Sequence, residues 1–274
     1  MSTSGNPEFI RSATNPAIAL VRALGRRDRR AAERAFVVEG VRAVQDGLAA
    51  GVLPRLLLVR QGEEELLGEL VLPPGTPVRI VERGLFDRLS EVQHPQGVLA
   101  VFPWPNFVAA LDSTAPLVLV LDRLRDPGNL GTLLRAAAAA GVTAVFLTAA
   151  SVDPWNAKVV RAGMGAHWRV PVLPFDAAAA HALRPRLSRR VAAAADANQT
   201  YDAVDWSGPA ALIVGGEAEG VSRELLAWAT ESAAIPLAGG VESLNAAVAG
   251  AVMLFEAARQ RRIKTGCNVL DQSR

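Results

Sequence analysis

Three short turns in the second half of the chain combine glycine with side chains that can hold a ligand. The first has an Asp-Pro-Gly turn at 126–128. Asn129 follows it where a helix N-cap would stand, and Arg135 lies about one and a half helical turns further on. An amide can bind hydroxyl groups, and a guanidinium binds phosphate through two parallel hydrogen bonds. A capped turn with a surface arginine would explain the proline and the glycine, but not the three residue types together.

The other two turns have the same character. The second, GGEAEG at 215–220, follows an apolar run, and its glycines let the backbone approach a ligand closely. The third, ESLN at 242–245, opens the last expected helix. Purely structural roles are open for both, since Glu217 would favour a helix N-terminus and Ser243 could be an N-cap. Each turn alone is weak evidence of a function.

Buried parallel strands are expected to position these turns. Short, continuous apolar runs separated by helical stretches are typical of parallel strands that helices cover on both faces. In such a sheet, ligands bind beyond the carboxyl ends of the strands, and the first two turns follow strand ends. The expected strands are 117–122, 144–148, 170–174, 191–196 and 211–216, with another around 233–237 and a last helix over about 243–262.

A smaller α/β domain is expected before this sheet. Helical and extended segments alternate from about residue 15 to 102, and Asn15 can cap a helix through Arg26. Further helices are expected at 41–51 and near 62–70 and 83–91, and strands at 36–40, 55–60, 78–82 and 97–102. The segment 103–116 has several prolines and no strong period, so we expect two domains, residues 1–105 and 106–274.

The composition is that of a folded protein of the reducing cytoplasm. Half of the 274 residues are hydrophobic and a fifth are charged. The only cysteine is Cys267, and the three histidines have no ligand spacing, so neither disulfides nor a metal site are expected. No apolar stretch free of turn residues reaches about 18 residues, and the start lacks the pattern of a secretion signal. We therefore expect a cytoplasmic protein without a membrane span.

Arginine supplies nearly all of the positive charge. The formal net charge is +2, and Lys158 and Lys264 are the only lysines. Several arginines crowd one early segment, where they could follow a line of phosphate groups. A solvated helix face explains them equally well, and both interpretations stay open. These residues are Arg22, Arg26, Arg27, Arg29, Arg30 and Arg34.

Together and in this order, the three turns resemble the signature motifs of the SpoU/TrmH RNA methyltransferases. Asn129, Gly131 and Arg135 match the first motif, Gly215, Glu217 and Gly220 the second, and Ser243, Leu244 and Asn245 the third. The segment 156–172 resembles the family's basic segment, and Ala218 stands where glycine is common. More loosely, 36–51 and 94–102 are similar to the family's substrate-binding domain, which is related to RNA-binding ribosomal proteins.

The resemblance implies a fold, a cofactor and an activity. Expected are a deep trefoil knot in the parallel-sheet domain, a homodimer, and methylation of a ribose 2′-hydroxyl in RNA. S-adenosylmethionine would contact Gly215, Gly216, Ile235, Leu237, Leu244 and Asn245. Arg135 would be catalytic, with Asn129, Glu217, Ser243 and Asn245 positioning the reacting groups. Since a guanidinium holds its proton tightly, we expect Arg135 to bind the neighbouring phosphate and stabilise the alkoxide rather than act as the base that the family assignment suggests.

Ribosomal RNA is favoured over transfer RNA as the substrate, because the first domain resembles ribosomal proteins. A transfer RNA methyltransferase and a non-catalytic RNA-binding relative remain alternatives, although Asn129, Arg135, Glu217 and Asn245 argue against lost activity. A third alternative is a nucleotide-binding oxidoreductase. Gly163-Met164-Gly165 begins its glycine pattern, but Trp168 stands where the third glycine belongs.

Overall fold

The computed structural model describes residues 7–107, 113–217 and 219–266. Ala218, Cys267 and part of the expected junction at 103–116 lie outside them. By its contacts the chain divides into two compact units, Met1–Asn106 with Asp153–Trp168, and Phe107–Val152 with Arg169–Arg274. The two units change at 106/107, one residue after the boundary expected from the sequence. Residues 153–168, which the sequence assigned to the second domain, pack in the first unit.

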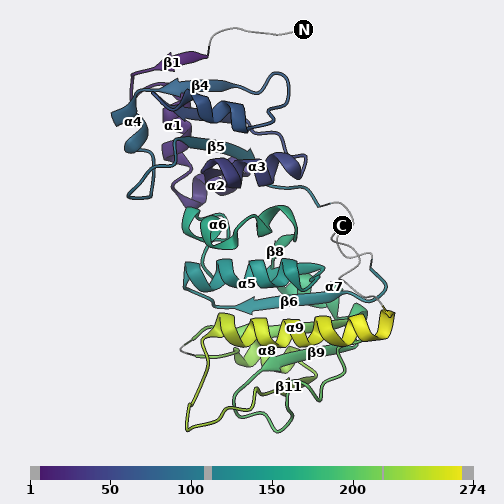
Figure 1. The fold of residues 1–274 in the computed structure, drawn as a ribbon. Coiled ribbons are helices and arrows are strands. Elements are labelled where there is room, and N and C mark those ends of the chain that lie inside the picture. Colours follow the sequence, from purple (N-terminus) through teal and green to yellow (C-terminus); the bar gives the residue numbers. More distant parts are fainter. Residues whose placement is uncertain (1–6, 108–112, 218, 267–274) are drawn as a thin grey trace. The chain divides into compact units, whose positions relative to one another are not determined.

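The first unit is built on a mixed sheet in the order β1-β4-β3-β5-β2 (Figure 1). β4 pairs in parallel with β1 and β3, whereas β5 pairs antiparallel with β2 and β3. β2 to β5 lie where the sequence predicts strands, and β1 was not anticipated. The bounds are β1 Glu8–Ile10, β2 Ala35–Glu39, β3 Leu56–Arg60, β4 Val78–Val81 and β5 Val98–Pro103.

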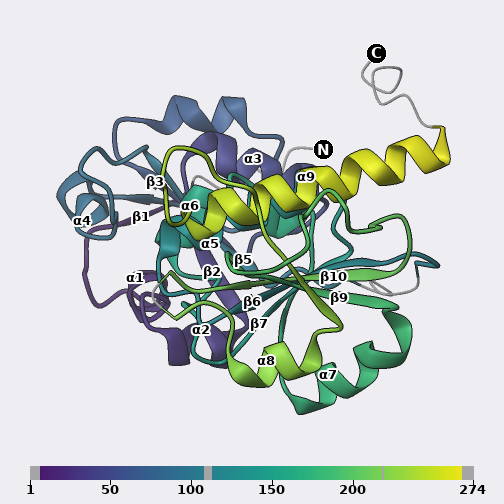
Figure 2. The same ribbon diagram turned by 90° about the horizontal axis from the view of Figure 1, so that it is seen from below.

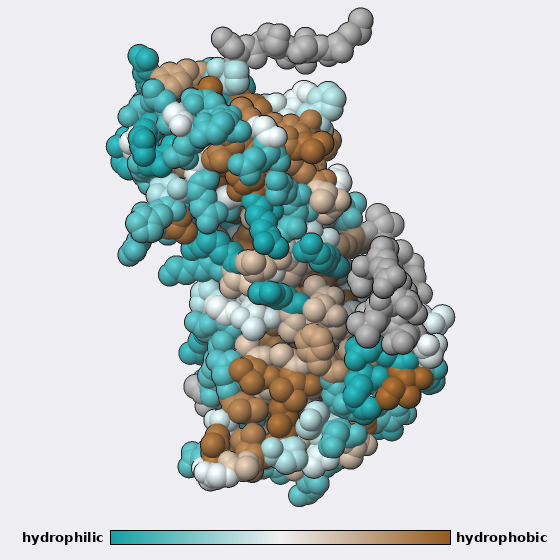
Figure 3. Space-filling model, viewed as in Figure 1, coloured by the Kyte–Doolittle hydropathy of each residue, from teal (hydrophilic) through white to brown (hydrophobic). Residues whose placement is uncertain are grey.

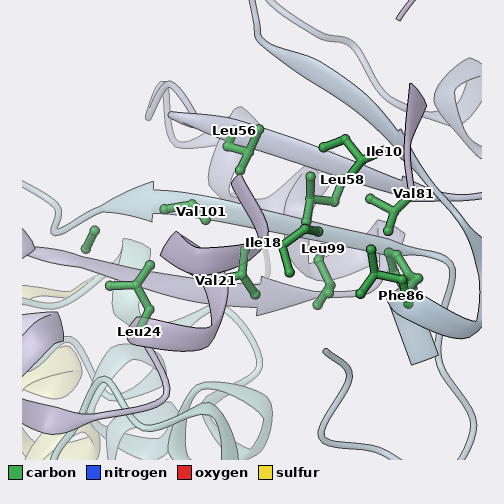
Figure 4. Close-up of a cluster of buried hydrophobic side chains, with 12 residues drawn as sticks. Ile10, Ile18, Val21, Leu24, Leu56, Leu58, Val81, Phe86, Leu99 and Val101 are labelled. Carbon is green, nitrogen blue, oxygen red and sulfur yellow. The ribbon is translucent and has the colours of Figure 1, made fainter. Parts of the chain in front are cut away.

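Helices cover both faces of this sheet, because its strands are apolar on both sides. Leu56 and Leu58 of β3 pack in one cluster with α1 and α4 (Figure 4). Leu57 and Val59 pack in another, on the opposite face. The helical segments are α1 Pro16–Ala23, α2 Arg27–Glu33, α3 Val41–Ala49, η1 Glu64–Glu69, α4 Arg83–Asp87, α6 Ala157–Gly163 and η2 Ala166–Trp168.

The segment 153–168 belongs to the second of these clusters through its tryptophans. The Trp155 ring lies 4.9 Å from that of Phe36, and the Trp168 ring lies 4.9 Å from that of Phe102. Arg30 donates to the Asp153 carboxylate at 2.7 Å in a buried pair. These contacts join residues between 66 and 123 positions apart, which explains why sequence periodicity assigned the segment to the second domain.

The second unit contains a wholly parallel sheet in the order β11-β9-β10-β6-β7-β8. This confirms the expected parallel-sheet α/β fold. Each of its strands overlaps or adjoins a predicted one. The bounds are β6 Leu117–Asp122, β7 Ala144–Leu147, β8 Val172–Pro174, β9 Arg189–Ala193, β10 Ala210–Gly215 and β11 Glu231–Ala233.

Its helices lie on both faces of the sheet (Figure 2). α5 (Pro127–Ala139) packs against α9 (Ala246–Thr265) on one face, while α7 (Ala177–Leu183) and α8 (Arg223–Trp228) lie on the other, with η3 (Arg184–Arg186) after α7. Gly250 permits the α5–α9 contact, because a Cβ there would lie 2.5 Å from the Leu133 side chain. α5 begins just after β6, and α9 follows the third turn.

Candidate active site

Asp126, and not Asn129, caps α5. The Asp126 carboxylate accepts a hydrogen bond from the Asn129 backbone N–H at 2.7 Å. Pro127 takes the first helical position, where its fixed φ fits and its missing N–H costs nothing. The expectation that Asn129 is the N-cap is therefore wrong, and the side chain of Asn129 is left free for other partners.

Those partners come from the other two turns. The Asn129 Nδ2 donates to the Glu217 carboxylate. Its Oδ1 accepts from Asn245 Nδ2 at 3.0 Å. Asn245 caps α9 at the same time, since its own Oδ1 accepts from the backbone N–H of Ala247 and Val248. The structure thus brings Asn129, Glu217 and Asn245, one from each turn, into one hydrogen-bonded group, which we call the Asn129 junction.

Two of the expected catalytic residues stand outside this junction. Arg135 is exposed on α5, on the same outer face as Thr132, and it makes no hydrogen bond or ion pair with another described residue. Six positions along a helix turn its side chain about 120° from that of Asn129. Ser243 is also exposed and is not the N-cap of α9, because Asn245 holds that position. The Arg135 guanidinium is accordingly available to an external anion.

The second turn is closed tightly on itself. Gly220 donates its N–H to the Gly216 carbonyl at 3.0 Å. A Cβ on Gly215 would lie 2.0 Å from the backbone of Gly220, and one on Gly216 would lie 2.6 Å from the Arg123 carbonyl oxygen. Both positions therefore require glycine, because the backbones of Gly220 and Arg123 fill the space that a side chain would take.

The loop that leads into α9 combines exposed apolar side chains with available main chain. Leu237, Val241 and Leu244 are 37%, 54% and 37% exposed, and Ile235 is partly buried. Within the described part of the chain, the main chain of 236–244 makes no hydrogen bond to another segment. Apolar walls with open amides fit an adenine ring and a methionine tail, so the residues present suit the expected cofactor.

Sequence reasoning missed the residues that fasten the second turn. Arg123 and Asp122, at the end of β6, contact Glu219 and the backbone of Ser222. The contacts span about 100 positions, and no spacing rule would pair them. The signal available was weak: four of the five residues in DRLRD at 122–126 are charged, directly after an apolar strand.

Comparisons with known proteins agree with this geometry. The sequence model of the SpoU rRNA Methylase family matches residues 116–255, and that of the MRM3-like substrate binding domain matches residues 15–100. The chain belongs to the SpoU rRNA methylase family. It is an S-adenosylmethionine-dependent RNA methyltransferase, which confirms the expected family, enzyme class and cofactor.

Relatives of this SpoU methylase align over most of its length. The mitochondrial rRNA methyltransferase 3 of Mus musculus is 35% identical, over 84% of this chain and 68% of its own. The 23S rRNA (guanosine(2553)-2′-O)-methyltransferase RlmP of Bacillus subtilis is 31% identical, over 90% of this chain and 97% of its own. The AdoMet-bound rRNA methyltransferase structure from Sinorhizobium meliloti is 32% identical, with a TM-score of 0.81 over 93% of this chain and 98% of that one.

Family membership removes the oxidoreductase alternative. Gly163 ends α6, and Met164 follows it in a left-handed conformation, so the glycine pattern does not follow a strand as nucleotide binding requires. Among the residues that the structure describes, no cluster of three or more His, Cys, Asp or Glu side chains could hold a metal ion. Within the same residues, no helix is long and apolar enough to cross a membrane.

The early arginine cluster is not a uniform phosphate-binding arm. Arg30 is buried against Asp153, Arg26 pairs with Asp28 at 2.8 Å, and Arg34 lies over the Trp104 ring. Arg29 lies 3.9 Å from Glu33. Arg22 and Arg27 are exposed. At least four of the six cations thus have partners within the first unit, which favours a structural reading for most of the segment.

Proposed function

We propose that the protein transfers the methyl group of S-adenosylmethionine to a ribose 2′-hydroxyl of large-subunit ribosomal RNA. The observation that carries this proposal is the Asn129 junction. It joins the three motif turns, and its Asn129 lies on the same helix as the exposed Arg135. The ribosomal target is supported by the match to a substrate-binding domain and by the names of the relatives in Mus musculus and Bacillus subtilis.

The proposed cofactor site consists of the second turn and the loop before α9. Bound there, S-adenosylmethionine supplies an electrophilic methyl group on a sulfonium sulfur. The backbone of the second turn and the apolar side chains of the loop hold the cofactor's adenosine and methionine parts. The residues are Gly215, Gly216, Ile235, Leu237, Leu244 and Asn245.

Arg135 is the proposed catalytic residue. Its exposed guanidinium binds the phosphate next to the target ribose and stabilises the negative charge that develops on the 2′-oxygen. The proton leaves the 2′-hydroxyl to that phosphate or to water, because a guanidinium keeps its own proton and cannot accept another. Alignment of the two reacting atoms is the larger part of the work, and such alignment can lower a barrier by roughly 7–11 kcal/mol.

The Asn129 junction serves this alignment. Glu217 fixes which amide atom of Asn129 donates, and Asn129 in turn fixes Asn245 at the start of α9. The second turn and the start of α9 are thereby held in fixed positions relative to α5. Ser243 is exposed two residues before Asn245, and its proposed role is to contact the ribose.

Mapping of ribose methylation in cells tests the target. Total RNA from cells with and without this gene is scanned for 2′-O-methyl groups. The proposal predicts one large-subunit ribosomal position that loses its methyl group without the gene. A position lost from transfer RNA would favour the transfer RNA alternative, and no change at any position would favour the non-catalytic one.

The proposed assembly is a homodimer through the outer face of α9. Val248 and Phe255 are 49% and 46% exposed, and Val252 lies between them on the same side of the helix. Figure 3 shows hydrophobic surface gathered over the first half of α9. An exposed apolar stripe of this kind is typical of a contact surface, and the homodimer that the family resemblance implies supports a second copy as the occupant.

We also propose a cytoplasmic location and a knotted chain path. The single cysteine, which leaves no disulfide within the chain, supports the location, and cell fractionation tests it. The tight second turn and membership of the SpoU family support a trefoil knot near residues 215–245. Tracing of the main chain in a crystal structure of the protein tests it.

A further inference from the structure

Arg123 has a backbone conformation that arginine rarely adopts. Its φ is +53°, in the left-handed region that favours glycine and asparagine. The turn around it is fixed, because its N–H donates to Thr148 Oγ1 at 2.9 Å and the N–H of Leu124 donates to Ser151 Oγ at 3.2 Å. A strained residue held this firmly indicates that its side chain is needed in the position that the strain provides.

That side chain reaches the second turn. The Arg123 guanidinium donates to the Glu219 carboxylate and, at 3.4 Å, to the Gly220 carbonyl oxygen. The contact joins positions 96 residues apart. Charge-assisted hydrogen bonds are among the stronger polar contacts in proteins, so this pair can hold a loop in a single shape.

Two further contacts fasten the same turn to the end of β6. Asp122 is 2% exposed, and its carboxylate accepts the Ser222 N–H at 2.8 Å. The backbone of Gly216 lies directly against the Arg123 carbonyl, as the 2.6 Å approach of a hypothetical Cβ shows. The turn is therefore held at its beginning, at its middle and at its end, and the hydrogen bonds to Glu219 and Gly220 in the middle come from the Arg123 side chain.

We propose that Arg123 is a positioning residue for S-adenosylmethionine, an inference that rests on the proposed cofactor site. By holding Glu219 and Gly220, Arg123 fixes the shape of the turn whose Gly215 and Gly216 main chain faces the cofactor. The residues after Arg123 lead directly into α5. The cofactor turn and the helix that carries Asn129 and Arg135 thus share one anchor.

Arg123→Gly removes the side chain while suiting the backbone. Glycine adopts a positive φ without strain but gives the unfolded chain more freedom, and the two effects on stability oppose each other. We expect the thermal midpoint of the cofactor-free protein to stay near that of the wild type. By calorimetry of the full chain without RNA, the Kd for S-adenosylmethionine should rise about tenfold, a change typical of losing one partly exposed charge-assisted bond.

Glu219→Gln tests the partner side of the same contact. Glu219 is 54% exposed, so its replacement does not disturb the fold. Glu219→Gln should also raise the Kd. The Kd of the double variant should be close to that of the single variant that binds more weakly, because both substitutions remove the same contact. If the Kd of the double variant rises by the product of the two single increases, the substitutions act independently, which would contradict the proposal.

Arg125→Ala is the matched control. Arg125 also carries a positive charge near Glu219, at 3.8 Å, but its side chain is 74% exposed. Its removal should leave the Kd unchanged. An Arg123→Gly protein with wild-type affinity would overturn the proposal, as would one whose affinity falls only together with its thermal midpoint while Glu219→Gln binds normally.

Leu244→Ala separates this proposal from the cofactor site on which it rests. If Leu244→Ala binds S-adenosylmethionine as well as the wild type, the proposed site is wrong. If Leu244→Ala weakens binding and Arg123→Gly does not, the site stands and the role of Arg123 is refuted.

Discussion

At the scale of single residues, Asn129 shows what the motifs predict and what they leave out. The family motifs named Asn129, Glu217 and Asn245, and the structure brings these three into contact. The motifs did not reveal the order of donors and acceptors. Asn245 donates to Asn129, and Asn129 donates to the Glu217 carboxylate, which can only accept. Arg135 lies apart from the Asn129 junction, as a spacing of six residues on one helix requires, since this turns the side chains of Asn129 and Arg135 about 120° from each other.

Arg135→Ala should abolish methyl transfer and leave cofactor binding nearly intact. The Arg135 side chain is exposed and makes no hydrogen bond or ion pair with another described residue, so its loss should leave the fold and the proposed cofactor site intact. Single-turnover methylation and calorimetry with S-adenosylmethionine measure the two effects. Arg135→Lys, which keeps the charge but not the planar fork, should retain part of the rate. Near-normal single-turnover transfer by Arg135→Ala would refute its catalytic role.

His167 predicts how stability depends on pH. Burial lowers the pKa of His167 from 6.5 to about 4, and Nε2 lies 2.8 Å from the Pro154 carbonyl oxygen. The neutral ring favours the folded state, whereas the ring in the unfolded chain takes up a proton below its ordinary pKa. The stabilisation is therefore complete above pH 6.5 and is lost as the pH falls to about 4, by about 3 kcal/mol in all.

Urea unfolding across this pH range, with the wild type beside His167→Gln, measures the effect. The free energy of unfolding of the wild type should fall relative to that of the variant between pH 6.5 and 4. A difference between the two proteins that stays constant over this range would show that His167 does not cause it.

At the scale of elements, strand positions were predictable and helix starts were less so. Continuous apolar runs identified the strands of the second unit, because parallel strands are buried on both faces. Asn15 was correctly predicted as a cap, and its side chain accepts the Ala17 N–H at 2.9 Å. The helix expected through Arg26 ends at Ala23, and the site helices α5 and α9 are capped by Asp126 and Asn245. For α5, Pro127 was the signal that could have located the cap.

Asn245 and Ser243 form a matched pair for testing the cap of α9. Asn245→Ala removes a side chain that accepts two helix N–H groups, and the free energy of unfolding should fall by about 1 kcal/mol. Ser243→Ala should leave it unchanged within about 0.5 kcal/mol, as for an exposed side chain without a structural partner. Denaturant unfolding of both variants makes the comparison. A larger loss for Ser243→Ala than for Asn245→Ala would contradict the observed capping.

At the scale of the whole molecule, fewer arginines are available to bind RNA than the composition suggests. Arg30 and Arg190 are nearly buried, and Arg261 donates to the backbone carbonyls of Trp206, Ala115 and Gly208. Composition cannot separate such cations from exposed ones. The place of 153–168 in the first unit was unpredictable for a related reason, since the aromatic partners of Trp155 and Trp168 lie far away in sequence.

The proposed dimer makes a prediction at this scale. Phe255→Glu places a charge at one end of the exposed stripe on α9, and burial of an unpaired charge is costly. Sedimentation at micromolar concentration should show a dimer for the wild type and a monomer for the variant. Glu256→Gln, next along the helix and paired with Arg259, is a control that should stay dimeric. A monomeric wild type would refute the proposed assembly.

Transfer of a labelled methyl group to purified RNA tests the central claim most directly. The protein is incubated with methyl-labelled S-adenosylmethionine and with large-subunit ribosomal RNA or transfer RNA, and the product is digested with alkali. A methyl group on the ribose 2′-oxygen protects the adjacent phosphodiester bond from alkali. We predict that the wild-type protein labels ribosomal RNA and that alkali leaves the label in a resistant dinucleotide. The Arg135→Ala variant should transfer no label. Label on a base, or equal labelling by wild type and Arg135→Ala, would contradict it.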